Sequence, residues 1–599
     1  MQPQIGIREI IRFTKETLRP FYKYVLVMII SGLVWAIDLS LRPYLFRMIL
    51  NIVSEVSPAN VAHALFWPIL YYLSTMIMLS ASYRLYDFFI EARLMPEWRG
   101  RILETAFQYV IKNDYTFFHR TLSGTISTRM NDLVESVPDL FQIFVDKFAT
   151  RVVAIVFVLF TLSRVNSIFA LMTVIWVAIF IALSFYGGVK GRALSNQRFA
   201  QYAQLTGNTV DIFSNISTVW LYSAIPHEIT RFKTGVFKIV ALIKQLETLR
   251  FFLWLFFGVS FISLQALSLY FLVQKRSENS ITVGDFSLIL TLNVSLASFI
   301  WDLARDFSQF AKHLGKIGQS LSMLYEQSEV SDLADARPLE VKHGSIQFES
   351  VQFYYQGGKE TLFQNESVFI PAGQKVGLVG SSGSGKTTFV NLILRLYDVK
   401  SGRILIDDQD IRSVTLDSLR KSIIVVQQES ALFHRSVREN IAYGNEDVTD
   451  KEIREAAEKA HIHDTIMRLP NGYATVIGEK GFKPSGGEKQ RLAIARGSMK
   501  KNAKILILDE ITSQLDLKNE ASILHDLRKL MEDKTTIIIA HRFSTLLYVD
   551  RILVFDQGKI VEDGTHNELI AFNGFYKSLW DAQKEGLLFQ ESEQEPDLR

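Results

Sequence analysis

The residues best suited to chemistry lie in a glycine-rich run between Gly380 and Thr388. Gly380, Gly385, Lys386 and Thr387 match the pattern GxxxxGK[ST]. Glycines let a backbone wrap closely around phosphates, and the amides at a helix N-terminus attract anions. We expect Lys386 to reach the β- and γ-phosphates of a nucleotide and Thr387 to ligate Mg²⁺. The expected nucleotide-contacting residues of this run are Gly380, Ser381, Gly383, Ser384, Gly385, Lys386, Thr387 and Thr388.

The segments that flank this run have the pattern that a phosphate loop requires. An apolar run, Val376–Val379, precedes it and predicts a buried strand. A helical pattern, Phe389–Leu396, follows it. A glycine-rich turn that binds nothing is the alternative, and the strand–loop–helix context disfavours that alternative.

A second set of chemical groups follows at the ends of two predicted strands. Ile505–Leu508 ends in Asp509 and Glu510, and Thr536–Ala540 ends in His541. We expect Asp509 to bind Mg²⁺, and we expect Glu510 to polarise the attacking water as a general base. We expect His541 to contact the γ-phosphate. Alone, such residues are usually ordinary loop residues, but here they follow a phosphate loop in order.

Between the loop and the acidic pair, the run from Ser485 to Arg491 reads SGGEKQR and resembles the signature of the ABC transporter ATPases. The family pattern is of the Leu-Ser-Gly-Gly-Gln type, and this chain departs from it at Pro484 and Glu488. The resemblance implies that ATP and Mg²⁺ are the cofactors. It also implies that a signature binds the nucleotide held by a second ATPase domain, here through Ser485, Gly486, Gly487 and Glu488.

Other positions are similar to further elements of the family. Tyr355 looks like the aromatic residue that stacks on adenine. Gln428 is similar to the glutamine that links Mg²⁺ and the water to the membrane half, with Gln427 as the alternative. The resemblance places Asp516 in the loop that communicates between paired ATPase sites, and 478–481 in the segment that touches the partner's coupling loop.

The first half of the chain is apolar enough to enter a membrane. The mean hydropathy is +0.15 and the apolar residues concentrate before about residue 310. Because a membrane span needs about 20 mostly apolar residues, we expect six membrane spans. They are Phe21–Leu41, Ala62–Tyr83, Asp146–Leu162, Ile168–Tyr186, Phe251–Val273 and Ile281–Trp301. The third carries charges at its start, so we expect it to begin outside the membrane as a longer helix.

The loops between the spans differ in length and charge. Segments 84–145 and 187–250 are long, polar and helical in pattern, and with the N-terminal flank they hold most of the Lys and Arg of this first half. The positive-inside rule places them and both termini in the cytoplasm. Phe117–Gly124 and Ile225–Glu228 resemble the two coupling regions of exporter-type members. The amphipathic start of the chain predicts a helix on the membrane surface, with a frayed tail as the alternative.

Four polar residues lie within or directly next to the predicted spans. Asp38 and Arg42 are four residues apart on one helix face and are able to pair. We expect Gln265 and Asn293 to form hydrogen bonds between helices. Net charge is only +3, which gives no case for nucleic-acid binding. There is no cysteine, so disulfides and thiolate sites are excluded; whether the chain is natural or engineered in this respect stays open.

The expected fold is an α-helical six-span transmembrane domain followed by an α/β P-loop ATPase domain, with a β-rich and a helical subdomain. We expect a transmembrane domain over 1–325, a linker over 326–342, the ATPase domain over 343–584 and an acidic tail over 585–599. The whole resembles an exporter-type (type IV) half-transporter, like lipid flippases and multidrug exporters.

One phosphate loop and one signature imply a pair of chains, and a homodimer is favoured over a dimer with a related half-transporter. We expect an integral protein of a bacterial inner membrane that moves a hydrophobic or amphipathic substrate by alternating access. An importer of the same architecture and an ATP-gated channel or regulatory receptor are the alternatives.

Overall fold

The computed structural model describes residues 5–326, 328–355, 361–427, 431–445, 447–478, 482–509, 527–540 and 543–582. The chain forms two compact units, which we call the helical unit and the α/β unit. The helical unit comprises 1–112 and 123–326, and the α/β unit comprises 113–122 and 327–599. Ten residues from within the first half of the chain therefore belong to the second unit.

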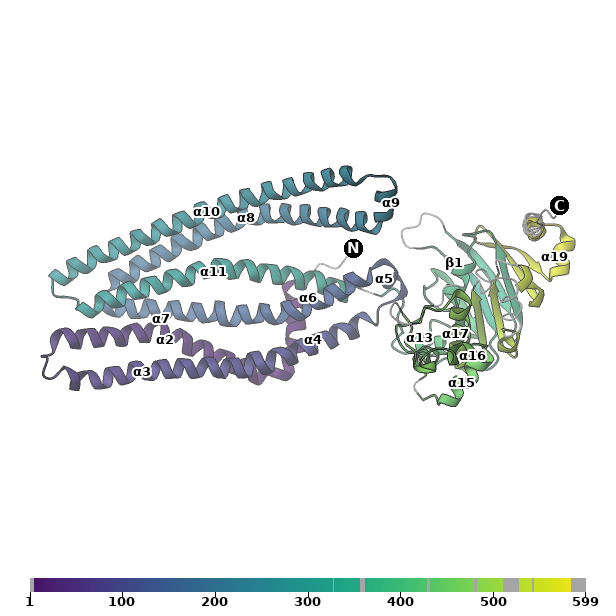
Figure 1. Cartoon of the computed structure of the whole chain (residues 1–599), viewed down its shortest axis with the longest axis horizontal. Coiled ribbons are helices and arrows are strands. Elements are labelled where there is room, and N and C mark those ends of the chain that lie inside the picture. Colours follow the sequence, from purple (N-terminus) through teal and green to yellow (C-terminus); the bar gives the residue numbers. More distant parts are fainter. Residues whose placement is uncertain are drawn as a thin grey trace. The chain divides into compact units, whose positions relative to one another are not determined.

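The helical unit consists of long helices joined by short turns (Figure 1). They are α1 (Ile7–Leu18), η1 (Arg19–Phe21), α2 (Tyr22–Glu55), α3 (Val61–Tyr86), η2 (Asp87–Leu94), α4 (Met95–Val110), α6 (Ser123–Gln142), η3 (Ile143–Ala149), α7 (Thr150–Val165), α8 (Ser167–Ser214), α9 (Ile216–Leu221), α10 (Ile225–Ser277) and α11 (Val283–Leu324). The segments 84–145 and 187–250 are helical almost throughout, as their patterns predict.

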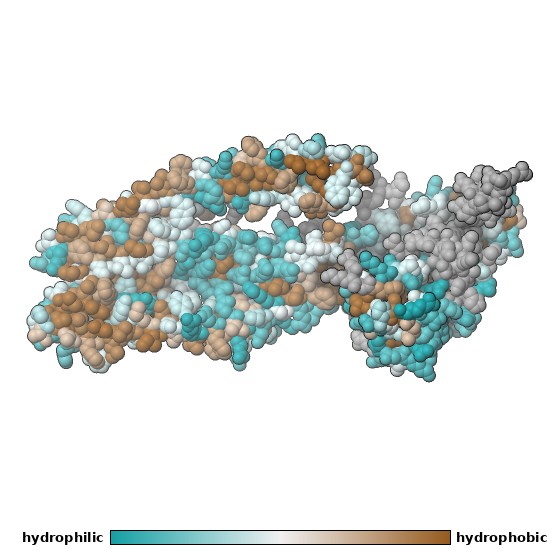
Figure 2. Space-filling view, viewed as in Figure 1, coloured by the Kyte–Doolittle hydropathy of each residue, from teal (hydrophilic) through white to brown (hydrophobic). Residues whose placement is uncertain are grey.

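Five helical stretches among the described residues are long and apolar enough to cross a membrane: 7–55, 61–110, 167–214, 225–277 and 283–324. The third predicted span lies on η3 and α7, and α7 alone has 16 residues. Helical structure runs without a break from α6 through the π-helical η3 into α7, so this span does begin as a longer helix. Figure 2 shows apolar residues gathered over one end of the helical unit.

The four polar residues singled out in the sequence, Asp38, Arg42, Gln265 and Asn293, each pair with a side chain in the helical unit. Asp38 forms a salt bridge with Arg42, and the Arg42 Nε lies 3.3 Å from Asp38 Oδ1. The Asn293 Nδ2 donates to Ser268 Oγ (3.1 Å) and to Gln265 Oε1 (3.4 Å). Both pairings confirm the sequence-based expectation, which follows from the cost of an unpaired polar group in an apolar surrounding.

The α/β unit contains two sheets. Its elements are α5 (Tyr115–Arg120), β1 (Ile346–Phe353), β2 (Phe363–Ile370), β3 (Lys375–Gly380), α12 (Lys386–Ile393), β4 (Ser401–Ile406), β5 (Gln409–Asp410), α13 (Leu416–Lys421), β6 (Ile423–Val426), α14 (Val437–Ile441), α15 (Asp450–Lys459), α16 (His463–Met467), η4 (Gly472–Ala474), α17 (Gly486–Ser498), β7 (Ile505–Asp509), β8 (Thr535–Ile539), η5 (Phe543–Tyr548), β9 (Arg551–Asp556), β10 (Lys559–Gly564) and α19 (His566–Phe572). The antiparallel sheet has the order β2-β1-β4-β5, and the larger sheet has the order β10-β9-β3-β8-β7-β6.

The larger sheet is parallel except for its edge strand β10. Its inner strands are almost continuous runs of Ile, Leu and Val, with β7 reading ILILD and β8 reading TTIII. Such runs are typical of parallel strands that are covered on both faces. One face packs against α12 and the antiparallel sheet, and helices that include α15 and α17 cover the other.

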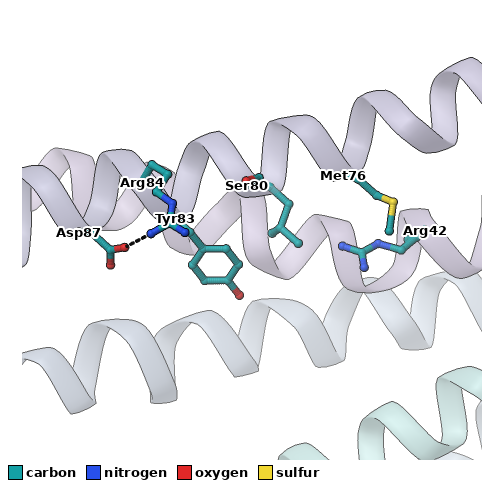
Figure 3. Close-up of a pocket in the computed structure, with 7 residues that line it drawn as sticks. Arg42, Met76, Ser80, Tyr83, Arg84 and Asp87 are labelled. Atoms are coloured by element: carbon teal, nitrogen blue, oxygen red, sulfur yellow. Dashed lines mark hydrogen bonds and ion pairs between the residues drawn. The ribbon is translucent and has the colours of Figure 1, made fainter.

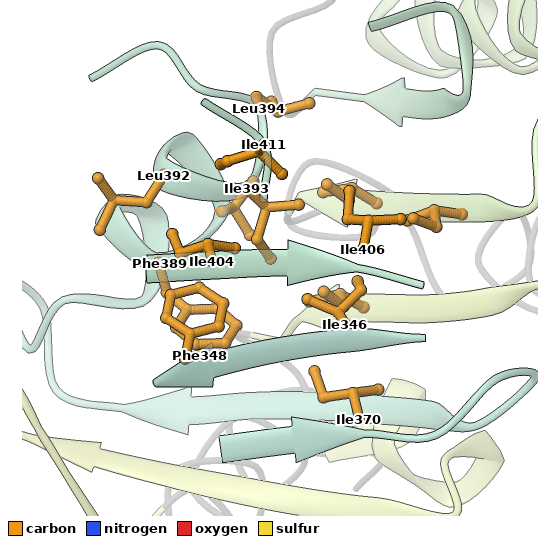
Figure 4. Packing of buried hydrophobic residues seen from close by; sticks show 14 of the residues in the cluster. Ile346, Phe348, Ile370, Phe389, Leu392, Ile393, Leu394, Ile404, Ile406 and Ile411 are labelled. Atoms are coloured by element: carbon orange, nitrogen blue, oxygen red, sulfur yellow. The ribbon is translucent and has the colours of Figure 1, made fainter. Parts of the chain in front are cut away.

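An aromatic stack holds α12 in place. The rings of Phe348 on β1 and Phe389 on α12 are stacked, 4.2 Å apart with 10° between their planes. Both side chains are fully buried among isoleucines of β1, β2 and β4 (Figure 4). The helix that follows the glycine-rich run is therefore fixed between two sheets.

Candidate functional site

Of the chemical groups predicted from the sequence, the phosphate loop and Asp509 lie at the carboxyl edge of the larger sheet within the described residues. In the register of parallel strands β3, β8 and β7, Leu378 pairs with Ile539 and Ile539 pairs with Asp509. Asp509 thus stands level with Leu378, two strands away, which is about 10 Å at the usual strand spacing. In an open parallel sheet, this edge is where ligands bind.

Three glycines give the phosphate loop its shape. Gly380, Gly383 and Gly385 have φ values of +150°, +80° and +111°, which side chains rarely allow. A Cβ on Gly380 would lie 2.1 Å from the Phe555 carbonyl oxygen, whereas one on Gly383 would meet no atom within 4 Å. Gly380 is therefore required by packing, and the backbone at Gly383 is open to an incoming group.

Lys386 stands at the first turn of α12 and points back into the loop. Its side chain is buried, and its Nζ donates to the carbonyl oxygens of Gly380 (2.8 Å) and Ser381 (2.9 Å). The cation is held where the loop would enclose phosphate groups, at a positive helix end. The Thr387 side chain beside it is exposed.

Tyr355 lies next to the first turn of α12. Its hydroxyl shares a hydrogen bond of 2.7 Å with the Thr388 hydroxyl on α12. Burial raises the pKa of Tyr355, and the bond to Thr388 acts in the opposite direction. The side chain remains 39% exposed, so part of its ring is available for stacking.

The signature residues begin α17. Ser485 is its N-cap, and the Glu488 carboxylate accepts a hydrogen bond of 2.7 Å from the Ser485 backbone N–H. Glu488 thus completes a capping box, which explains how this departure from the family pattern is accommodated. Pro484 is buried directly before the N-cap, and α17 still begins at Gly486 with its capping box formed.

Four predicted site residues, Gln428, Glu510, Asp516 and His541, lie outside the described residues, and their roles remain predictions. Gln427, the alternative to Gln428, directly follows β6 on the same sheet edge.

The described residues fit a nucleotide with Mg²⁺. The Thr387 hydroxyl and the Asp509 carboxylate are hard oxygen ligands of the kind Mg²⁺ prefers. No group of three or more His, Cys, Asp or Glu residues that could hold a metal occurs in the described part of the chain. Mg²⁺ at nucleotide sites usually takes one or two carboxylates together with the phosphate oxygens of the nucleotide, and Asp509 would supply one such carboxylate.

The sequence did not reveal that α5 belongs to the α/β unit. Its N-cap, Asp114, accepts a hydrogen bond of 2.9 Å from the Phe117 N–H and another of 2.5 Å from the Glu329 N–H. Tyr115 contacts Tyr397, with ring centroids 5.7 Å apart. The Asp114 cap was a recognisable helix start, but contacts across more than 200 residues leave no local pattern.

Known families match both parts of the chain. The family model described as "ABC transporter transmembrane region" matches residues 24–299, and the model described as "ABC transporter" matches residues 363–513. A structure titled "Structure of a bacterial Atm1-family ABC exporter with ATP bound" covers 94% of this chain and 98% of its own, with a TM-score of 0.82 and 29% identity.

Curated relatives give the same result. An "Uncharacterized ABC transporter ATP-binding protein" from Haemophilus influenzae is 36% identical over 80% of this chain and 78% of its own length. The human "ATP-binding cassette sub-family B member 6" is 38% identical over 66% of this chain, and "Iron-sulfur clusters transporter atm1, mitochondrial" from Aspergillus fumigatus is 40% identical over 55%. The chain spans less than half the length of these two.

Proposed function

Because this chain belongs to the ABC transporter family, as an ATPase coupled to transport, we propose that it exports an amphipathic substrate across a bacterial inner membrane as a homodimer. The observation that carries the proposal is the match of nearly the whole chain, both units included, to an ATP-bound exporter. The proposed orientation places both termini and the α/β unit in the cytoplasm, with domain boundaries at 325/326, 342/343 and 584/585.

Each residue of the site has one task in this proposal. Tyr355 stacks on adenine, while Lys386 and the loop amides bind the β- and γ-phosphates. Thr387, Asp509 and Gln428 hold Mg²⁺, which neutralises charge that develops on the phosphates. Glu510 takes a proton from the attacking water, and His541 donates a hydrogen bond to the γ-phosphate.

The proposed partner is a second copy of the chain. Each copy supplies the phosphate loop of one ATP site and Ser485–Glu488 of the other, with Asp516 between the two sites. Apolar side chains at the end of α9 support this pairing: Trp220, Leu221 and Tyr222 are 62%, 83% and 80% exposed. Figure 2 shows apolar residues continuing along α8 and α10. An exposed aromatic tip of this kind favours a protein partner over water.

A cavity in the helical unit supports an amphipathic substrate. It measures about 410 Å³, lies between α2 and α3, and is lined by Arg42, Met76, Leu79, Ser80, Tyr83, Arg84 and Asp87 (Figure 3). Apolar and charged side chains line it together, and Arg84 Nη1 lies 3.4 Å from Asp87 Oδ2. Its three charged residues stand next to the ends of the predicted spans, so the cavity offers charged groups beside apolar ones, as an amphipathic substrate requires.

A second candidate cargo is related to iron–sulfur clusters, and the name of one relative favours it. These 599 residues contain no cysteine, so the chain cannot bind such a cluster through its own thiolates. Cargo of this kind would have to carry its own sulfur ligands.

The test is transport and ATP hydrolysis by the full chain in proteoliposomes, with Glu510→Gln as the matched control. A panel of lipids, cationic drugs, peptides and thiol-containing peptides is offered on the α/β-unit side. We expect one class to stimulate hydrolysis and to accumulate on the opposite side, and we expect Glu510→Gln to abolish both. Accumulation toward the α/β-unit side would refute export, and hydrolysis without movement of any substrate would support a regulatory ATPase.

A further inference from the structure

We propose that Tyr397 couples the adenine end of the nucleotide site to α5 within the same chain. Its ring forms a continuous line of contacts from Tyr355 to Tyr115. This inference rests on the adenine-stacking role proposed above for Tyr355.

The contacts are ring to ring throughout. The Tyr397 ring centroid lies 5.2 Å from that of Tyr355 and 5.7 Å from that of Tyr115, edge to face in both pairs. The buried Phe353 ring contacts both Tyr355 (5.0 Å) and Tyr397 (5.8 Å). Edge-to-face pairs at these distances are attractive and depend on orientation.

Tyr355 also contacts α12, the helix that follows the phosphate loop. Thr388, in the first turn of α12, shares the hydrogen bond with Tyr355, and α12 ends at Ile393, four residues before Tyr397. Tyr355 is thus tied to the phosphate-binding helix through its hydroxyl and to Tyr397 through its ring. Because the Phe348–Phe389 stack fixes α12, a shift of Tyr355 is resisted on one side and passed to Tyr397 on the other.

The turn that carries Tyr397 is itself anchored. Arg395, two residues earlier, is buried and donates from Nε to Asp398 (2.8 Å) and from Nη2 to the Ser331 carbonyl oxygen (3.2 Å). Two residues before Ser331, the Glu329 N–H donates to Asp114, the N-cap of α5. The chain segment 329–331 therefore holds α5 and the Tyr397 turn together, so Tyr115 cannot drift from Tyr397 without breaking these bonds.

Coupling between two groups is reciprocal, and this gives the proposal its test. Tyr115 lies on α5 and has no assigned contact with ATP. If the ring contacts couple α5 to Tyr355, removal of the Tyr115 ring should nevertheless weaken nucleotide binding. The phosphates do not depend on this route, so a ligand without a base should be unaffected.

The experiment measures binding of a non-hydrolysable ATP analogue and of tripolyphosphate to the full chain in lipid nanodiscs. We expect Tyr397→Ala to weaken analogue binding by about 3- to 10-fold, the range for loss of one aromatic pair, and to raise the KM for ATP with little change in kcat. Tyr115→Ala should weaken it by a smaller factor, and it should have no further effect in the Tyr397→Ala background. Tyr397→Phe, which keeps the ring, should restore wild-type affinity, and tripolyphosphate binding should not change.

The controls separate coupling from damage. Tyr354→Ala removes a neighbouring tyrosine that contacts Lys400 instead, and we expect no effect on affinity. Wild-type affinity in Tyr115→Ala, independent effects of Tyr115→Ala and Tyr397→Ala, or equal losses for both ligands would overturn the proposal. Tyr355→Ala tests the adenine role alone: no loss there refutes that role, whereas a loss there with none at Tyr115 refutes only the coupling.

Discussion

The phosphate loop shows how strongly single residues constrain this site. Gly380, Gly383 and Gly385 all adopt positive φ, but they differ in what surrounds them. At Gly380 the carbonyl of Phe555 occupies the space of a side chain, and at Gly383 that space is empty. The two glycines are therefore needed for different physical reasons, packing at Gly380 and ligand approach at Gly383.

Gly380→Ala should destabilise the α/β unit far more than Gly383→Ala. Alanine at Gly383 meets only the conformational cost of positive φ, about 1–2 kcal/mol. At Gly380 a contact of 2.1 Å is added to that cost, so β3 or β9 must move. Thermal unfolding of both variants without nucleotide measures the difference, and equal melting temperatures would contradict it.

Much at the residue scale could be predicted from the sequence because the signals are local. The spacing of Gly380, Lys386 and Thr387 predicts the loop, and a separation of four residues predicts the Asp38–Arg42 pair. The contact of Lys386 with its own loop carbonyls could not be predicted, since it depends on how the folded backbone turns.

At the scale of elements, a buried ionic cluster joins α11 to η3 and α7. Asp306 has no exposed surface, and it pairs with Lys147 (3.1 Å) and with Arg151. Asp302, one helical turn away, also reaches Arg151 (3.5 Å) but is 39% exposed. The predicted sixth span ends at Trp301, and burial of Asp306 was not predicted, because no local pattern tells which charges a fold will bury.

Asp306→Ala should cost about 3–5 kcal/mol, since it leaves two cations without their buried partner. Asp302→Ala is the matched control and should cost less than about 1 kcal/mol, as expected for a partly exposed pair. Unfolding of the detergent-solubilised chain gives both values. A smaller loss for Asp306 than for Asp302 would show that the cluster contributes little.

A second element, the turn after β4, is closed by one carboxylate. Asp407 accepts hydrogen bonds of 2.8–3.0 Å from the backbone N–H groups of four consecutive residues, Lys342 to Ser345. Burial alone would raise its pKa, but these bonds outweigh that effect and lower it.

The pH dependence of Asp407 follows from the sign of this shift. A lowered pKa means that the ionised form stabilises the fold above the unfolded-state value of about 3.9, and that this contribution is lost as the pH falls below it. Asp407→Asn should lower the melting temperature near pH 7 and flatten its decline between about pH 4 and pH 2.5. Parallel wild-type and variant curves over that window would contradict this role.

At the scale of the whole molecule, one phosphate loop and one signature per chain predict sites shared between two copies. The Lys386→Ala homodimer and the Gly487→Asp homodimer should each lack ATPase activity. A mixed dimer of these two variants should recover activity, because one of its sites then combines an intact loop with an intact signature.

The mixed dimer is purified with two different affinity tags after co-expression. Mixing the two homodimers after purification is the control, since it forms no shared sites without exchange of subunits. Recovery only after co-expression confirms sites shared between chains. Absence of recovery would indicate that each chain binds ATP alone or with a different partner.

The larger architecture was predictable where it depends on composition. Long apolar runs indicated the spans, and buried strand patterns indicated the parallel sheet. Membership of 113–122 in the α/β unit was not predictable, because it results from contacts with residues such as Glu329 and Tyr397.

That membership has a consequence for how the protein is made. Residues 113–122 leave the ribosome more than 200 residues before the first strand of the α/β unit, which begins at Ile346. Domains generally fold in the order of their synthesis, but this unit cannot take up α5 until its own sheets exist. Docking of α5 therefore has to follow the formation of these sheets, late in the maturation of the chain.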